Sequence, residues 1–138
     1  MRKTAGEIET DVFNILKTSI LKSIIKGLVY REGIRPIDSK VEDAVISFLA
    51  GVDGEIQTGV FNLNVYVPNI DNGQNKGVLV KNVSRCLEIE RICENLVESI
   101  SLSGEYKFSL DSIIKSFKVD DIDQYFVNCR LKFKRSTF

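Results

Sequence analysis

The sequence contains no histidine among its 138 residues. Histidine is the most common general base near neutral pH and the most common zinc ligand, so its absence excludes imidazole-based catalysis and most zinc sites. Cysteine is also scarce, since Cys86, Cys93 and Cys129 are odd in number and show no Cys-x-x-Cys spacing. We therefore expect these three residues to be reduced thiols in or beside the core of a cytosolic protein, without a disulfide or metal role.

An excess of charge of either sign is lacking too, because nineteen basic residues balance nineteen acidic ones. This balance gives no global bias towards nucleic acids or anionic membranes. No apolar run approaches the roughly 18 residues that cross a bilayer. Acidic residues at Glu7 and Glu9 interrupt the segment where a signal peptide would be apolar. We expect no signal peptide, no membrane partner and no specific nucleic-acid partner.

The strongest pattern that is present lies between residues 57 and 68. From Phe61 to Val67 the apolar residues alternate with polar or amphipathic ones, in the order Phe-Asn-Leu-Asn-Val-Tyr-Val. A period of two predicts a strand with one face in the core, and Pro68 ends it because proline cannot donate to a ladder. Burial of the four apolar side chains would contribute about 1.5–3 kcal/mol each before the loss of entropy.

Further strands are expected on both sides of this one. Ala44–Leu49 is apolar, and the turn-rich Gly51–Gly54 that follows predicts an antiparallel hairpin with the 61–67 strand. The remaining predicted strands are Leu28–Tyr30, Glu105–Leu110, Ile113–Val119 and Tyr125–Lys134. In the last of these, Tyr125 falls with the inward set and the outward set is basic.

Two segments are predicted to be helical. Thr4 and Glu7 have the spacing of a capping box and open a helix over Ala5–Lys17, followed by a short piece over Ile20–Ile25. A long helix begins at Asn82 or Ser84 and ends at Ile100, with an exit turn at 101–104. Both helices are amphipathic.

These elements define one α+β domain over residues 1–138. Helix, strands, helix and strands in this order predict a mostly antiparallel sheet of four to six strands. The N-terminal helix and the long central helix are expected to pack on one face of that sheet. An apolar share of 43% and a charged share of 28% are those of an ordinary soluble domain.

The loops Gly51–Gln57 and Asn69–Lys81 are the candidate contact surfaces, because they are long and polar. The candidate interaction residues are Asp53, Glu55, Gln57, Asn69, Asp71, Asn72, Gln74, Asn75 and Lys76. A calcium site in the second loop is disfavoured, since Asp71 is its single carboxylate and calcium requires several oxygen ligands. No metal or cofactor site is predicted.

The order and texture of the elements resemble the tail-terminator (tail-completion, head–tail joining) proteins of tailed bacteriophages and prophages. The resemblance covers nearly the whole chain, without a catalytic or metal motif. It is carried by Lys26–Tyr30, Arg35–Pro36, Ala44–Phe48, Phe61–Val67, Ser84–Ile100, Leu102–Gly104 and Tyr125–Lys134. The long connection around Arg35–Pro36 and the Asp/Asn-rich loop depart from the family pattern.

The resemblance implies a structural role in virion assembly and no enzymatic activity. Such proteins form a ring, typically hexameric, that caps the tail tube and joins it to the head connector. The implied partners are copies of the chain, tail-tube proteins and head-connector proteins. The implied location is the bacterial cytoplasm during assembly and then the tail or neck of the virion.

Two other classes of function stay open. Asp43 followed by Glu55-Ile-Gln57 has a spacing similar to metal-dependent nucleases, with Gln57 in place of the lysine that would stabilise charge. Three acids at Asp120, Asp121 and Asp123 are interpreted as a surface turn. A small nucleic-acid or peptide-binding module would use a basic strand with an aromatic platform. Its residues would be Arg130, Lys132, Lys134 and Arg135 with Tyr125 or Phe126.

Overall fold

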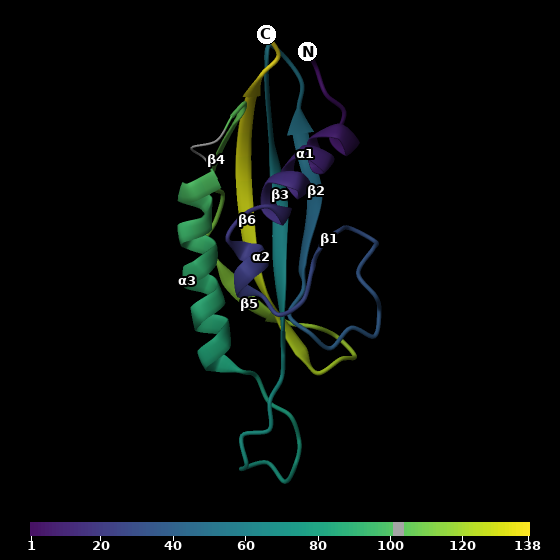
Figure 1. Ribbon diagram of the computed structural model, residues 1–138, viewed down its shortest axis with the longest axis vertical. Coiled ribbons are helices and arrows are strands. Elements are labelled where there is room, and N and C mark those ends of the chain that lie inside the picture. The colour runs from purple at the N-terminus through teal and green to yellow at the C-terminus, as the bar shows by residue number, and fades with distance from the viewer. Residues whose placement is uncertain (101–103) are drawn as a thin grey trace.

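A computed structural model describes residues 1–100 and 104–138 of the chain (Figure 1). Within these residues the helices are α1 (Ala5–Lys17), α2 (Leu21–Ile24) and α3 (Val83–Ile100). The strands are β1 (Val29–Arg31), β2 (Ala44–Val52), β3 (Ile56–Pro68), β4 (Tyr106–Leu110), β5 (Lys115–Lys118) and β6 (Gln124–Ser136). The predicted exit turn at 101–104 lies outside the described residues except for Gly104.

The strands form one sheet in the order β1-β2-β3-β6-β4, and β5 pairs with the other half of the same edge of β6. Every pairing is antiparallel except that of β1 with β2, which is parallel. The α+β class and the mostly antiparallel sheet are therefore confirmed, and so is the predicted hairpin. The parallel pair is possible because the connection 32–43 is long enough to return the chain to the start of β2.

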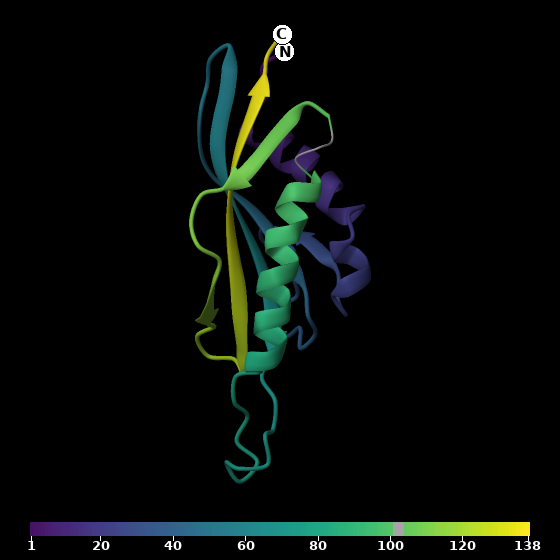
Figure 2. The same ribbon diagram turned by 90° about the vertical axis from the view of Figure 1, so that its left-hand side faces the viewer.

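The core lies against one face of the two longest strands. In β3 the predicted alternation is confirmed, since Phe61, Leu63, Val65 and Val67 are buried. Their register partners in β6 are Leu131, Cys129, Val127 and Tyr125. Buried residues of α1 and α3 belong to the same apolar cluster as these strands. In Figure 2 the helices lie on one side of the strands.

Two local predictions agree with the structure, the capping box of α1 and the burial of the three cysteines. The capping box of α1 is present, with Thr4 and Glu7 bonded in both directions. Cys86, Cys93 and Cys129 are buried free thiols. In the described part of the chain, no helix is long and apolar enough to cross a membrane.

The hairpin extends further than the sequence indicates. β2 continues to Val52 and β3 begins at Ile56, so the predicted loop Gly51–Gln57 shrinks to residues 53–55. Gly51 and Gly59 face each other in the register. A Cβ on Gly59 would lie 2.5 Å from both the Ala50 carbonyl oxygen and the Phe133 ring, so glycine is required there. Because Gly51 and Gly59 have no side chains, β2 and β3 can remain hydrogen-bonded to each other beside the Phe133 ring.

Candidate functional site

The face of the sheet opposite the core, called here the open face, gathers the polar and basic side chains of β6. Directly paired residues in antiparallel strands share a face, so the register assigns the neighbours of each β6 residue. The open-face residues of β6 are Phe126, Asn128, Arg130, Lys132 and Lys134. Their partners in β3 are Tyr66, Asn64, Asn62, Val60 and Thr58.

Aromatic rings cluster at one end of the open face. Phe126 lies 5.7 Å from Tyr66 and 5.4 Å from Phe117 of β5, measured between ring centroids. The guanidinium of Arg35 lies 4.0 Å from the Tyr66 centroid, which places a cation on the outer side of that ring. The sequence alone indicated Phe126 as the single aromatic residue of the basic face, whereas the structure adds Tyr66 and Phe117.

Amide side chains occupy the middle of the open face. The Asn128 side-chain amide donates to the Asn62 and Asn64 side-chain oxygens, at 3.0 and 2.7 Å. Because these bonds cross from β6 to β3, they fix the register of the two central strands. The amides also keep this stretch polar between the aromatic end and the basic end.

Cations occupy the other end of the open face. Lys107 of β4 pairs directly with Lys134, and Ser109 pairs with Lys132. These residues line a hollow of about 550 Å³, together with residues 50–52 of β2 and 58–60 of β3. Like charges directly opposite each other destabilise a sheet unless something else compensates them. The basic outer face predicted for the last strand is therefore confirmed and extends to β4.

Arg135 does not belong to that face. It is only 4% exposed, and the alternation of β6 turns it to the core side, where it reaches Gln57 and Glu105. Its predicted place in a basic binding platform is therefore wrong. Tyr125, as expected, packs against the core.

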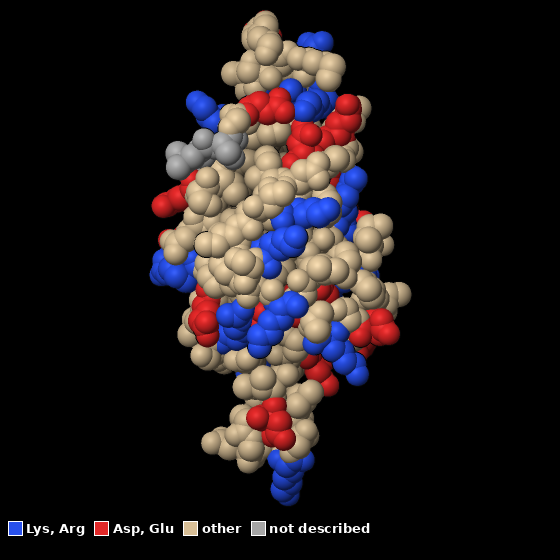
Figure 3. Space-filling model, viewed as in Figure 1, with Lys and Arg blue, Asp and Glu red and all other residues tan. Residues whose placement is uncertain are grey.

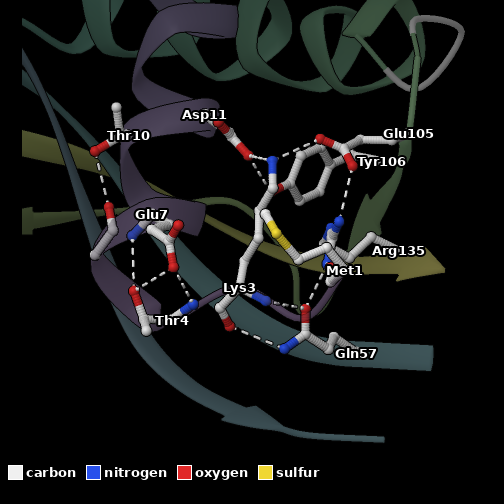
Figure 4. A network of polar contacts seen from close by, with 11 residues as sticks. Met1, Lys3, Thr4, Glu7, Thr10, Asp11, Gln57, Glu105, Tyr106 and Arg135 are labelled. Atoms are coloured by element: carbon white, nitrogen blue, oxygen red, sulfur yellow. Dashed lines mark hydrogen bonds and ion pairs between the residues drawn. The ribbon is translucent and has the colours of Figure 1, made fainter. Parts of the chain in front are cut away.

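Arg135 is instead part of a partly buried polar network, called here the terminal cluster (Figure 4). Its members are Met1, Lys3, Asp11, Gln57, Glu105, Tyr106 and Arg135. The cluster ties the first residues of the chain and α1 to β3, β4 and β6. The N-terminal amine also donates to the Thr137 carbonyl, so the two chain ends meet beside the cluster.

The terminal cluster shifts the ionisation of its members. Hydrogen bonds from Lys3 and then from Arg135 lower the pKa of Glu105. Burial pushes the pKa of Asp11 upward, but hydrogen bonds from Lys3 and Tyr106 outweigh it and the net pKa is lowered. Burial raises the pKa of Tyr106, and its hydrogen bond to Asp11 adds to the rise. These shifts are those of a structural ion-pair network, since each group is held by another member.

The nuclease-like spacing does not assemble into a site. Asp43 precedes β2 and is fully buried, bonded to Arg35, Ser39 and the Leu28 backbone N–H. Glu55 lies beyond the opposite end of β2, about 30 Å away for nine residues at about 3.4 Å each. Gln57 belongs to the terminal cluster and is only 5% exposed. The proposed pairing of Asp43 with Glu55 and Gln57 is wrong.

The predicted polar loop forms a projection over residues 69–82 that extends beyond the sheet (Figure 1). Its base is closed by paired backbone bonds between Ile70 and Val80. The side chains of Asp71 and Asn72 each accept a hydrogen bond from the backbone N–H two residues ahead, which shapes the turns at the tip. The candidates Asp71, Asn72, Gln74, Asn75 and Lys76 are exposed there, whereas Asn69 is partly buried at the base.

The other candidate residues lie at the far end of the molecule. Asp53 and Glu55 are exposed at the hairpin turn, and Asp53 accepts a hydrogen bond from the Gln57 side chain at 3.0 Å. The two predicted loops are therefore at opposite ends and cannot form a single site. Gln57 is not part of the exposed surface.

The remaining acidic residues do not converge. In residues 1–100 and 104–138, no three His, Cys, Asp or Glu side chains lie close enough to hold a metal ion. Asp120, Asp121 and Asp123 are exposed in the turn before β6. Figure 3 shows the helix-covered side, where acidic and basic residues are interspersed.

Comparison of the chain with models of known protein families and with curated proteins finds no match. Its function has to be inferred from its own surfaces.

Proposed function

We propose that this protein is a structural assembly subunit similar to the tail-terminator proteins of tailed bacteriophages. Copies of the chain would form a ring, typically of six, that caps a tail tube and docks on a head connector. Assembly would take place in the bacterial cytoplasm and leave the ring in the virion neck. The role requires no cofactor and no catalytic group.

The observation that carries the proposal is the apolar content of the projection. Val78 is 64% exposed, and Leu79 and Ile70 are also exposed. A solvated loop has no need of apolar side chains, whereas a loop that inserts into a neighbour gains by burying them. The projection also carries most of the candidate interaction residues.

A ring requires two different surfaces on each subunit, because its contacts are heterologous. The connection 32–43 offers the second apolar surface, since Ile37 is 94% exposed and Ile34 is exposed as well. In the proposed arrangement, α1 and α3 cover one face of the sheet. The projection of one copy would then lie against the connection of the next.

Assembly can be tested by measuring mass in solution with light scattering and native mass spectrometry. We expect the wild-type chain to form a closed oligomer, a multiple of the 15.6 kDa protomer. Deleting Asp71–Asn75, or replacing Val78 and Leu79 with serine, should yield a folded monomer because the buried apolar contact is lost.

A matched control replaces two exposed apolar residues elsewhere, Ile20 and Ile113. This double serine variant should keep the oligomer. The proposal fails if the wild-type chain stays monomeric at high concentration, or if the deletion variant assembles as the wild type does. Circular dichroism melting of each variant separates lost assembly from lost folding.

A further inference from the structure

The cations of the open face are not neutralised within the molecule. Lys107, Lys115, Arg130, Lys132 and Lys134 lie on three neighbouring strands, and none forms an ion pair among the described residues. Asp111 lies beside Arg130, but the contact between them is a backbone hydrogen bond from the Asp111 N–H to the Arg130 carbonyl at 2.8 Å. The β3 residues paired with β6 on this face are uncharged: Tyr66, Asn64, Asn62, Val60 and Thr58. The open face therefore attracts anions.

The same face carries one exposed aromatic ring, Phe117, and two partly buried ones, Phe126 and Tyr66. Phe117 is 41% exposed and stacks on Phe126, which contacts Tyr66. From Phe126 to Lys134, the eight steps between successive residues of β6 span about 27 Å at about 3.4 Å each. That length suits a few nucleotides, near the low end of the roughly 4–16 nucleotides that compact single-strand-binding folds cover.

We infer that the open face binds single-stranded nucleic acid without reading its sequence. Phe126 stacks on the Phe117 ring and the Lys115 ammonium lies 5.0 Å from its centroid, so a base would stack on Phe117 by displacing that ammonium. Phosphates would lie along Arg130, Lys132, Lys134 and Lys107. Aromatic rings beside a basic track are the combination that such binding uses, because every base has a π-face and every nucleotide a phosphate. A duplex keeps its bases stacked on one another, so it would use the cations and not the rings.

This inference does not rest on the proposed ring, because one copy of the chain presents the whole face. It departs from the expectation of no specific nucleic-acid partner only in proposing sequence-independent binding. The aromatic part of the face was hidden in the sequence, since Tyr66 and Phe117 meet Phe126 only through strand pairing.

The test is fluorescence anisotropy with a labelled oligo-dT of about 12 nucleotides, which is longer than the few nucleotides that the open face is expected to cover. A duplex with the same number of phosphates is the comparison. We expect the single strand to bind more tightly, with an affinity that falls as salt rises. Replacing Lys132 and Lys134 with glutamine should weaken binding roughly tenfold and lower the slope of log K against log salt by roughly 1.4, about 0.7 per phosphate contact.

Two further variants make the test specific. Replacing Lys22 and Lys26 with glutamine removes the same charge from two exposed lysines outside the open face and should leave binding unchanged. Phe117→Leu keeps an apolar side chain but removes the ring, and should weaken single-strand binding roughly fivefold or more without changing duplex binding.

Three outcomes would overturn the inference: no binding at low salt, a duplex bound at least as tightly as the single strand, or equal loss in the Lys22/Lys26 control. Measuring the Asp71–Asn75 deletion variant in parallel separates the two proposals. If the deletion variant is monomeric but still binds the single strand, the open-face inference is supported and the result does not depend on the ring. If the protein assembles but does not bind the single strand, the open-face inference is refuted and the proposed ring is not.

Discussion

Each end of the sheet is closed by a polar network, and the two networks differ in how far they exclude water. At one end Arg35, Ser39, Asp43 and Gln124 form what we call the connection cluster, which fastens the 32–43 connection. Asp43 has only 1% of its side chain exposed. At the other end the terminal cluster includes Glu105, whose side chain is 46% exposed.

The difference shows that burial, and not the number of bonds, sets what each network contributes. A buried charge that loses its partner has no water to replace it, whereas a half-exposed one is rehydrated. The connection cluster should therefore be sensitive to any change in its partners. The terminal cluster should tolerate changes at its exposed members and respond to pH and salt.

Arg35→Met should have the largest effect of the substitutions considered. It leaves Asp43 buried without its cation, and it removes the bonds of Arg35 to Gln124 and its contact with the Tyr66 ring. Loss of one partner of a buried pair costs about 3–5 kcal/mol. Urea denaturation monitored by circular dichroism would measure the decrease in the free energy of unfolding.

Arg35→Lys is the matched control, because it keeps the charge and loses the planar fork that bonds Asp43 and Gln124 together. It should recover part of the lost stability. The comparison between the clusters is wrong if Arg35→Met costs less than about 1 kcal/mol, the value of an exposed pair.

Arg135→Met should cost less than Arg35→Met. After this substitution Gln57 keeps its hydrogen bonds with the Lys3 backbone, and Glu105 keeps its ion pair with Lys3 and its exposure to solvent. We expect a loss of about 1–3 kcal/mol, the range for a broken hydrogen bond in a buried setting. Lys134→Met, on the exposed neighbour, should stay within about 0.5 kcal/mol of wild type. Equal costs for the two arginine variants would remove the distinction between the clusters.

The sequence predicted the parts of the fold that follow from local periodicity. The period of two over Phe61–Val67 and Tyr125–Lys134 placed the two central strands and their buried faces. The same period, continued by one step, turns Arg135 inward with Phe133. The charge of Arg135 favours the basic face, whereas its position in the alternation, two residues after the inward Phe133, indicates the core. The alternation predicts the side of Arg135 correctly, because Gln57 and Glu105 supply hydrogen-bond partners for the buried cation.

The parts that could not be predicted depend on which strands pair. Phe117 joins the open face because Phe117 pairs with Phe126, and no local pattern in β5 specifies that register. The parallel pairing of β1 is equally non-local. The connection 32–43 contains turns at residues 31–34 and 36–39, but the Arg35–Asp43 pair fastens it beside the start of β2. Candidate residues at Asp53 and Asp71 were identified from loop polarity, which says nothing about their lying at opposite ends.

Among the cluster variants, Glu105→Gln should have the smallest effect, and it separates the two clusters most sharply. Its bonds with Lys3 and Arg135, both at 2.9 Å, lower the pKa of Glu105 in the folded state. Because that group is half exposed, the loss at neutral pH should be a few tenths to about 1 kcal/mol.

A carboxyl whose folded-state pKa is lowered stabilises the fold above its unfolded pKa of about 4.3, and this stabilisation disappears as pH falls through the folded value. The difference in unfolding free energy between wild type and Glu105→Gln should therefore be complete near pH 6 and shrink towards zero near pH 3. Glu94→Gln, which removes an exposed pair with Arg91, should show little difference at any pH. A wild-type to Glu105→Gln difference that stays constant across this range would mean that Glu105 acts through packing alone, and that the terminal cluster is not the solvent-coupled network described above.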